Sequence, residues 1–265
     1  MNRYRYIDEN REHLHLLDEK PLIGTSSVVS VLAKNLTWWA AETSAVECLE
    51  VGEKIPTIRE EYLAACASSD KKKAIDELQI KYPIFKKARF AHFSDKNKKA
   101  DKGTDLHAEL EKYVKLMIID QGGIPHEING GHENPKVETF IQWAKENVKK
   151  FLWSEMYCYS ESLWVGGISD CGYESKDGQI GIIDFKSSKE AYDSQFIQIA
   201  GYDLQVRENG GFDKDGNKML EPVEANHYIV FPFGAEKLEA VSKFNVEELR
   251  EGFKSALTLH KLLNK

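Results

Sequence analysis

Residues 166–188, GGISDCGYESKDGQIGIIDFKSS, are the stretch from which we infer the fold. Apolar and aromatic residues dominate positions 163–173 and 180–185, and the polar segment 175–178, SKDG, separates the two runs. An Asp-Gly pair between two such runs predicts a β-hairpin. The second run, IGIIDF, is almost continuously apolar, which is typical of a central strand covered on both faces.

The turn type decides which residues of the hairpin face each other. A three-residue loop of residues 176–178, with Gly178 in the left-handed conformation, would place Asp170 directly opposite Asp184. A two-residue Asp-Gly turn would instead pair Asp170 with Phe185. The sequence leaves both registers open, and we build on the first, in which the two aspartate Cβ atoms would lie about 5 Å apart.

Two facing carboxylates destabilise a sheet unless something offsets their repulsion. A hard divalent cation would do so, because carboxylate oxygens are the ligands that Mg²⁺ prefers. Lys186 follows Asp184 by two residues, so its side chain leaves the same strand face. In the alternative interpretation, Asp170 and Asp184 are solvated strand residues and Lys186 is their surface ion-pair partner. A carboxylate and a lysine at the end of a buried strand seldom lack a partner, which favours the metal site.

Four short motifs around the hairpin resemble those of a known nuclease family. They are Gly-x-x-x-His at 103–107, Gly-x-x-Asp at 167–170, Ile-Asp-Phe-Lys at 183–186 and Gln-x-x-x-Tyr at 198–202. Their order and spacing resemble the PD-(D/E)XK nuclease superfamily, in particular its RecB-like exonuclease branch, over about residues 100–210. The resemblance implies an α/β fold with a restriction-endonuclease-like mixed central sheet flanked by helices.

The resemblance also implies a metal centre. Asp170 and Asp184 would bind one or two Mg²⁺ or Mn²⁺ ions, assisted by the backbone carbonyl of Phe185. His107 would lie near the metal or a phosphate, although a lone histidine in a first helical turn is more often structural. Glu155, on the strand expected before the hairpin, is a further candidate ligand. Such ions can activate water and neutralise the phosphate during phosphodiester hydrolysis.

Three further residues complete the implied catalytic site. Lys186 would orient or deprotonate the attacking water, and the sequence does not indicate whether its pKa is raised or lowered. Gln198 and Tyr202 are four residues apart, so they share one helix face and would position the lysine or the DNA. The alternative for this helix is an exposed, amide-rich face.

The charge distribution fits DNA as the partner better than the net charge of −7 does. Residues 71–102 carry eleven Lys or Arg against four acidic residues, so this segment is at +7 and the rest of the chain at −14. A basic patch beside an acidic metal site suits a phosphodiester enzyme. The alternative is a solvated lysine-rich helix and loop.

The four cysteines, Cys48, Cys66, Cys158 and Cys171, have no Cys-x-x-Cys spacing and suit a reducing compartment. No cysteine follows Cys171, so we expect no iron–sulfur cluster of the kind that some RecB-like nucleases hold near the C-terminus. No apolar run approaches membrane-spanning length, and the N-terminus is too acidic for a transit peptide. We therefore expect a cytoplasmic protein of a bacterium or a phage-infected cell, without membrane partners.

Two domains are expected: a helical N-terminal lobe with the basic segment at 1–100, and the nuclease core at 101–265. Residues 1–24 read as an arm or early loop. Helices are predicted at 59–66, 72–81, 104–120, 137–151, 194–206 and 246–263, and strands at 151–159 and 225–231. Trp38 and Trp39 are expected in the core or stacked on a base. His126 and His132 are expected in a surface loop.

The function that these observations favour is a metal-dependent DNA exonuclease acting in phage or bacterial recombination or repair. The preference for an exonuclease rests on the resemblance alone, and a structure-selective endonuclease is the nearest alternative. A non-cleaving nucleic-acid-binding module on the same fold is a second one. A homo-oligomer or a recombination partner protein is compatible with the sequence. An EF-hand at 213–224 is rejected because Lys218 stands where its loop requires glycine.

Overall fold

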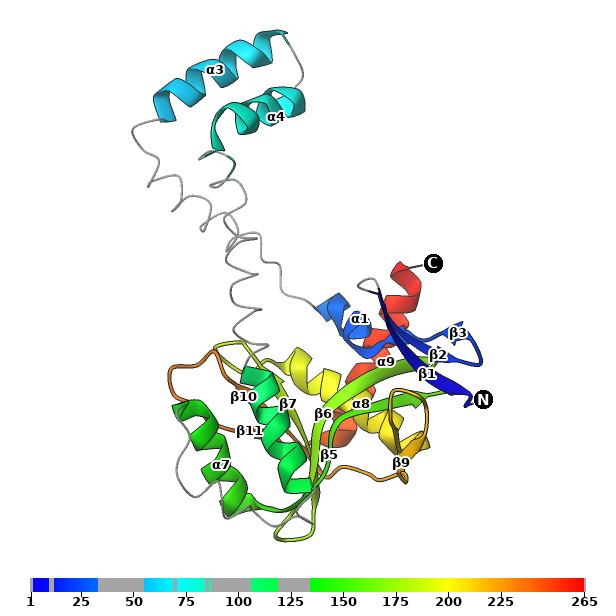
Figure 1. Cartoon of the computed structure of the whole chain (residues 1–265). Coiled ribbons are helices and arrows are strands. Elements are labelled where there is room, and N and C mark those ends of the chain that lie inside the picture. Colours follow the sequence, from blue (N-terminus) through cyan, green and yellow to red (C-terminus); the bar gives the residue numbers. More distant parts are fainter. Residues whose placement is uncertain are drawn as a thin grey trace. The chain divides into compact units, whose positions relative to one another are not determined.

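The computed structural model describes residues 2–9, 12–32, 55–68, 71–83, 86, 106–118 and 134–264 (Figure 1). The chain divides into two compact units, one of residues 1–33 with 103–265 and the other of residues 34–102. Among the described residues, none of the helices is long and apolar enough to cross a membrane.

The unit of residues 34–102 contains a pair of helices, α3 Ile55–Ser68 and α4 Lys71–Lys81. They pack through buried Ile58 and Leu78. Glu61 accepts hydrogen bonds from the Lys81 ammonium and from the Tyr82 hydroxyl, at 2.7 and 2.6 Å. The helical part of the expected N-terminal lobe therefore lies in this unit. Most of the basic segment, together with Trp38 and Trp39, lies outside the described residues.

The hairpin predicted within residues 166–188 is formed by β6 Val165–Ser175 and β7 Ile180–Lys186. Its register confirms the three-residue loop, because Cys171 pairs with Ile183. Gly178 has φ of +82°, and its amide donates to the Ser175 carbonyl at 2.9 Å. Glycine adopts this left-handed conformation without a steric penalty. The turn sequence thus sets the pairing of the two strands.

A mixed sheet surrounds the hairpin, in the order β11-β10-β7-β6-β5-β8-β9. The remaining strands are β4 Ile23–Gly24, β5 Val148–Ser160, β8 Gly211–Phe212, β9 Lys218–Leu220, β10 His227–Pro232 and β11 Val241–Lys243. β10 is parallel to β7, and α8 Asp193–Asn209 makes the crossover between them. The expected strand at 225–231 corresponds to β10.

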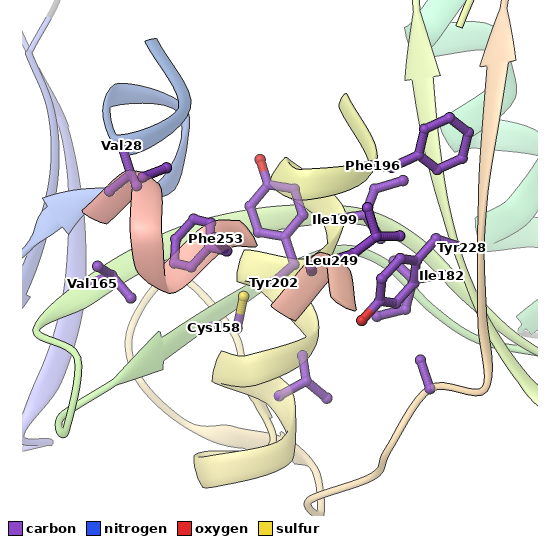
Figure 2. Close-up of a cluster of buried hydrophobic side chains, with 14 of the residues drawn as sticks. Val28, Cys158, Val165, Ile182, Phe196, Ile199, Tyr202, Tyr228, Leu249 and Phe253 are labelled. Atoms are coloured by element: carbon purple, nitrogen blue, oxygen red, sulfur yellow. The ribbon is translucent and has the colours of Figure 1, made fainter. Parts of the chain in front are cut away.

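Helices cover both faces of this sheet. The short helix α1 Thr25–Val29, α8 and α9 Val246–Leu263 pack on one face, with the 3₁₀ helix η1 Ser30–Leu32 after α1 (Figure 2). The helix of residues 106–118 and α7 Pro135–Asn147 pack on the other face. Ile182 belongs to the first cluster and Ile183 to the second, so β7 is covered on both faces as predicted. The observed class is α/β with a mixed sheet.

The N-terminal residues form structure that the sequence analysis missed. β1 Tyr4–Glu9, β2 Glu12–Leu17 and β3 Lys20–Pro21 make a three-stranded antiparallel sheet. The expectation of an arm or loop at 1–24 was therefore wrong. Tyr4 and Leu17 are buried against Tyr159 of β5, and this contact is the physical reason that residues 1–33 belong to the same unit as 103–265. The expected lobe thus begins at residue 34 rather than at residue 1.

The other predicted elements agree in type and differ at some ends. α9 spans the predicted residues, and α8 is longer than predicted by a few residues. α7 ends at Asn147 rather than 151, because residues 148–151 pair with β6. Its N-cap Asn134 accepts from the Lys136 amide at 3.1 Å, and Pro135 occupies the first turn. His126 and His132 lie outside the described residues.

Candidate active site

The candidate site lies where β7 separates from β6. β5 occupies one edge of β6. Along the other edge, β7 pairs with residues 171–174 of β6 and β4 pairs with residues 165–166. Residues 167–170 of β6 thus face no described strand there. The Asp170 carboxylate accepts the Phe185 amide N–H at 2.8 Å, in place of a backbone ladder bond. This contact brings Asp170 to the end of β7, beside Asp184.

Asp184 and Lys186 leave β7 on one face, as the strand period predicted. The Lys186 ammonium lies 2.7 Å from Asp184 Oδ2. Apart from this ion pair, neither Asp184 oxygen has a hydrogen-bond partner among the described residues. The Asp184 residue is only 1% exposed. Burial of a carboxylate whose one partner among the described residues is a single ammonium group is costly, which suits a site that takes up a further cation.

His107, Glu155 and Asp170 form a second group beside this pair. One ligand atom from each lies within 4.8 Å of the others. His107 Nε2 is 2.7 Å from Glu155 Oε1 and 3.9 Å from Asp170 Oδ2. The His107 ring meets the Phe185 ring edge-on. Asp184 is not a member of the three-residue group. The structure therefore brings three of the five expected ligands, His107, Glu155 and Asp170, into one group, and the fourth, Asp184, lies beside it.

The backbone of β5 is irregular at this group. Ser154 pairs with Cys171 and Met156 with Ser169, so Glu155 stands across from Asp170. Glu155 has φ of +48°, a conformation that is unfavourable for residues other than glycine. Trp153 and Met156 pack in the same core cluster although they are three positions apart, a spacing that places residues of a regular strand on opposite faces. Backbone strain of this kind is concentrated at functional sites.

We expect the strain at Glu155 to appear in the stability of two variants that both lack the carboxylate. Glu155→Gly should be more stable than Glu155→Gln by about 1 kcal/mol, because only glycine adopts the positive φ without cost. Both should bind divalent cations more weakly than the unmodified chain. Urea unfolding in EDTA measures the difference, and equal stability of the two variants would show that the positive φ carries no strain.

The acidic surroundings raise several pKa values in the metal-free protein. The hydrogen bond to Glu155 raises the pKa of His107 to about 9. Burial raises the pKa of Asp184 to about 7, although Lys186 acts in the opposite direction. Burial also raises the pKa of Asp170. For Lys186, burial lowers the pKa, but the two aspartates outweigh this effect and the net shift is upward. Lys186 is therefore an ammonium ion at neutral pH, which the sequence did not determine.

The glutamines of α8 have different roles. Gln198 Nε2 donates to the Tyr202 hydroxyl at 2.6 Å, which confirms that the two share a face. Burial and the nearby carboxylates of Asp184 and Asp170 hold the pKa of Tyr202 well above its ordinary value. Among the described residues, neither side chain has a hydrogen bond to Lys186.

The remainder of the amide-rich face is structural. Gln205 is fully buried and donates to Thr25 Oγ1 at 2.7 Å, which ties α8 to α1. Gln195 caps α8 by accepting the Tyr192 amide. An exposed amide-rich face, the alternative kept for this helix, was therefore wrong. The Thr25 contact was missed because its partner is 180 residues away in the sequence.

Two hollows adjoin the site. One, of about 830 Å³, is lined by Tyr202, by residues 166–168 of β6 and by residues of β2 and α1. The other, of about 600 Å³, is lined by Glu155 and its neighbours, by residues 212–214 and by Glu111 and Lys115. Of the candidate site residues, Tyr202 thus lines the first hollow and Glu155 lines the second.

A comparison with models of known protein families found no match to this chain, and a comparison with curated proteins found none either.

Proposed function

We propose that this chain is a metal-dependent deoxyribonuclease with a restriction-endonuclease-like fold of the RecB-like PD-(D/E)XK kind. The observation that carries the proposal is the Asp184 carboxylate, which is buried, has no hydrogen-bond partner among the described residues apart from its ion pair with Lys186, and lies beside Asp170 at an open edge of the sheet. Such a carboxylate can hold a cation that also touches a substrate in the adjacent hollows. Degradation from DNA ends, in phage or bacterial recombination or repair, is the part that rests on the resemblance to RecB-like exonucleases.

The donor set fits a hard divalent cation. Asp170, Asp184 and Glu155 offer carboxylate oxygens, and His107 offers an imidazole nitrogen. Carboxylates suit Mg²⁺ and Mn²⁺, so we propose one or two of these ions, with the Phe185 carbonyl as a further ligand. When bound, the cation would lower the pKa of a coordinated water and offset the charge of the scissile phosphate.

The protein side chains have separate roles in this proposal. The Lys186 ammonium donates hydrogen bonds to the attacking water or to a phosphate oxygen, and its raised pKa favours this role over that of a base. The paired Gln198 and Tyr202 form the wall of the site on the α8 side and orient the DNA strand. The hollow beside Tyr202 receives nucleotides next to the scissile bond.

The test is cleavage of end-labelled linear DNA and of a closed circle, with Mg²⁺, Mn²⁺ or EDTA. We expect loss of the linear DNA only, with either metal, and no loss in EDTA. Asp184→Ala should lose this activity, whereas the matched variant Asp215→Asn, in an exposed turn of the same unit, should retain it. Cutting of the circle would replace the exonuclease by an endonuclease. Absence of cutting with both metals would refute the proposed enzyme.

A further inference from the structure

A third hollow lies at the opposite end of the hairpin from the carboxylates. It has a volume of about 290 Å³ and adjoins the β6–β7 turn, the end of α7 and the segment after β11. Asp170 and Ser175 are five strand positions apart, which corresponds to about 17 Å. The hollow is therefore separate from the candidate active site, and its residues have no part in the proposed cleavage.

Four aromatic rings form the wall of this hollow, which we call the aromatic pocket. They are Trp143, Tyr173, His227 and Phe244. Trp143 meets Tyr173 edge-on at 5.5 Å between centroids, and Phe244 stacks on His227 at 5.4 Å. Phe244 is 68% exposed, so a ligand can reach its ring.

His227 has an unsatisfied nitrogen beside this pocket. The residue is 6% exposed, and its Nε2 lies 2.6 Å from the Tyr173 hydroxyl. Nδ1 is buried and has no hydrogen-bond partner among the described residues. Burial lowers the pKa of His227, so the ring is neutral; in the tautomer with the proton on Nε2, that nitrogen donates to the Tyr173 hydroxyl and Nδ1 is the acceptor. Rotation of the exposed Phe244 side chain, which stacks on the ring, would give a ligand access to Nδ1.

The charged groups at the pocket are mainly acceptors. Glu146 and Asp177 contribute exposed carboxylates. The one lysine that lines the pocket, Lys176, directs its ammonium to the Lys145 carbonyl at 2.6 Å. Aromatic faces with carboxylates and a nitrogen acceptor match a cation that is flat and rich in N–H groups.

We propose that the aromatic pocket binds a guanidinium group, supplied by an arginine side chain of a partner protein or by a small guanidinium compound. The planar group stacks on Phe244, donates N–H groups to Glu146 and Asp177, and reaches His227 Nδ1. An ammonium group fits less well, because it cannot stack and presents its donors from a single point. A nucleotide is disfavoured, because its phosphates would face two carboxylates.

The test follows backbone amide resonances of the full chain by NMR during titration with a blocked Gly-Arg-Gly peptide. We expect shifts at residues 143–147, 173–179, 227 and 242–244. Phe244→Ala should weaken binding about fivefold, and Glu146→Gln with Asp177→Asn about tenfold. All three substitutions are at exposed positions, so folding should be preserved. Glu236→Gln, an exposed carboxylate outside the pocket, should leave binding unchanged.

Further titrations distinguish the possible sources of the ligand and give the results that would overturn the proposal. Binding of the blocked peptide supports a protein partner, whereas binding of free arginine alone supports a small compound. The same peptide with citrulline, which is isosteric and uncharged, should not bind. Equal binding of the citrulline peptide, competition by dAMP, or an absence of shifts at the pocket would overturn the proposal. None of these outcomes depends on nuclease activity.

Discussion

Replacing Asp184 by asparagine is expected to make the metal-free protein more stable at pH 8 while removing the proposed nuclease activity. The residue is 1% exposed and its carboxylate has no hydrogen-bond partner among the described residues apart from its ion pair with Lys186, and burial raises its pKa from 3.8 to about 7. The native state therefore disfavours the ionised form, which asparagine does not have. Asp184 would then be present because the site needs its carboxylate, although the ionised carboxylate lowers the stability of the native state.

The sign of the pH dependence follows from the raised pKa. Between about pH 4 and 7 the native state binds the Asp184 proton and the unfolded state has lost it, so stability decreases as the pH rises. A shift of this size corresponds to an upper limit of about 4 kcal/mol. The variant leaves Lys186 without its ion-pair partner, which offsets part of the gain. We expect a net gain of about 1 to 2 kcal/mol at pH 8, or about 2 to 8 °C in melting temperature, that vanishes near pH 4.

The same substitution should remove the response to divalent cations. Mn²⁺ is expected to raise the melting temperature of the unmodified chain, because it binds the native state only, and to leave Asp184→Asn unchanged. Cleavage of linear DNA by the variant should decrease by about a thousandfold or more, since it loses stabilisation of several kcal/mol from the cation.

The control for both measurements is Asp215→Asn, which removes an exposed carboxylate. It should change neither the melting temperature in EDTA nor its response to Mn²⁺. If Asp184→Asn is less stable than the unmodified chain at pH 8, Asp184 is a structural ion-pair partner of Lys186. In that case the argument for a metal centre from the buried carboxylate fails, whatever the cleavage assay shows.

The hairpin could be predicted because its information is local. Lys176-Asp177-Gly178 fixes the turn, and Gly178 in the left-handed conformation fixes the register. The register in turn places Asp170 near Asp184, and the strand period places Lys186 on the same face. These relations involve residues within about 20 positions, for which turn chemistry and strand alternation are sufficient.

The missed features depend on distant contacts. Residues 4–17 carry many charges and read as an arm, yet Tyr4 and Leu17 are buried by Tyr159. Residues 148–151 continue a helical pattern, yet Lys149 and Lys150 both pair with Glu174 on β6. In each case the partner strand lies elsewhere in the sequence, and pairing with it outweighs local propensity.

The site itself was predicted in part. The residue types and the resemblance named the side chains, whereas the open edge of β6 and the positive φ of Glu155 could not be predicted from a pattern. One signal was present in the sequence. Gly167 begins the Gly-x-x-Asp motif, and a Cβ there would lie 2.6 Å from the Tyr202 ring. The glycine is therefore required for the close approach of α8 to β6.

The largest expected loss of stability is at Arg250, which is distant in sequence from the hairpin. Arg250 is 1% exposed, and its Nε donates to Asp203 Oδ2 at 2.7 Å. Asp203, fully buried on α8, also accepts the Tyr228 hydroxyl at 2.6 Å and the Ala225 amide at 3.1 Å. This network joins α8 and α9, which cover one face of the sheet, to β10, which pairs with β7.

Arg250→Met should decrease the free energy of unfolding by about 3 to 5 kcal/mol, because it leaves the Asp203 charge buried without its cationic partner. Burial already raises the pKa of Asp203, and removal of the guanidinium should raise it further. The variant should therefore lose most stability above neutral pH and less near pH 4, where Asp203 takes up a proton. Urea unfolding at pH 8 and pH 5 measures both effects.

A second substitution separates loss of charge compensation from loss of packing. Asp203→Asn with Arg250→Met contains no buried charge. Its asparagine Oδ1 accepts the Ala225 amide, and its Nδ2 donates to the Tyr228 hydroxyl oxygen in place of the bond that Asp203 Oδ2 accepts. The double variant should recover part of the loss, and its stability should be nearly independent of pH between 5 and 8. If it is as unstable as Arg250→Met alone, the contribution of Arg250 is the packing of its side chain between α8 and α9. The ion pair would then add nothing, as occurs when desolvation cancels the attraction of two buried charges.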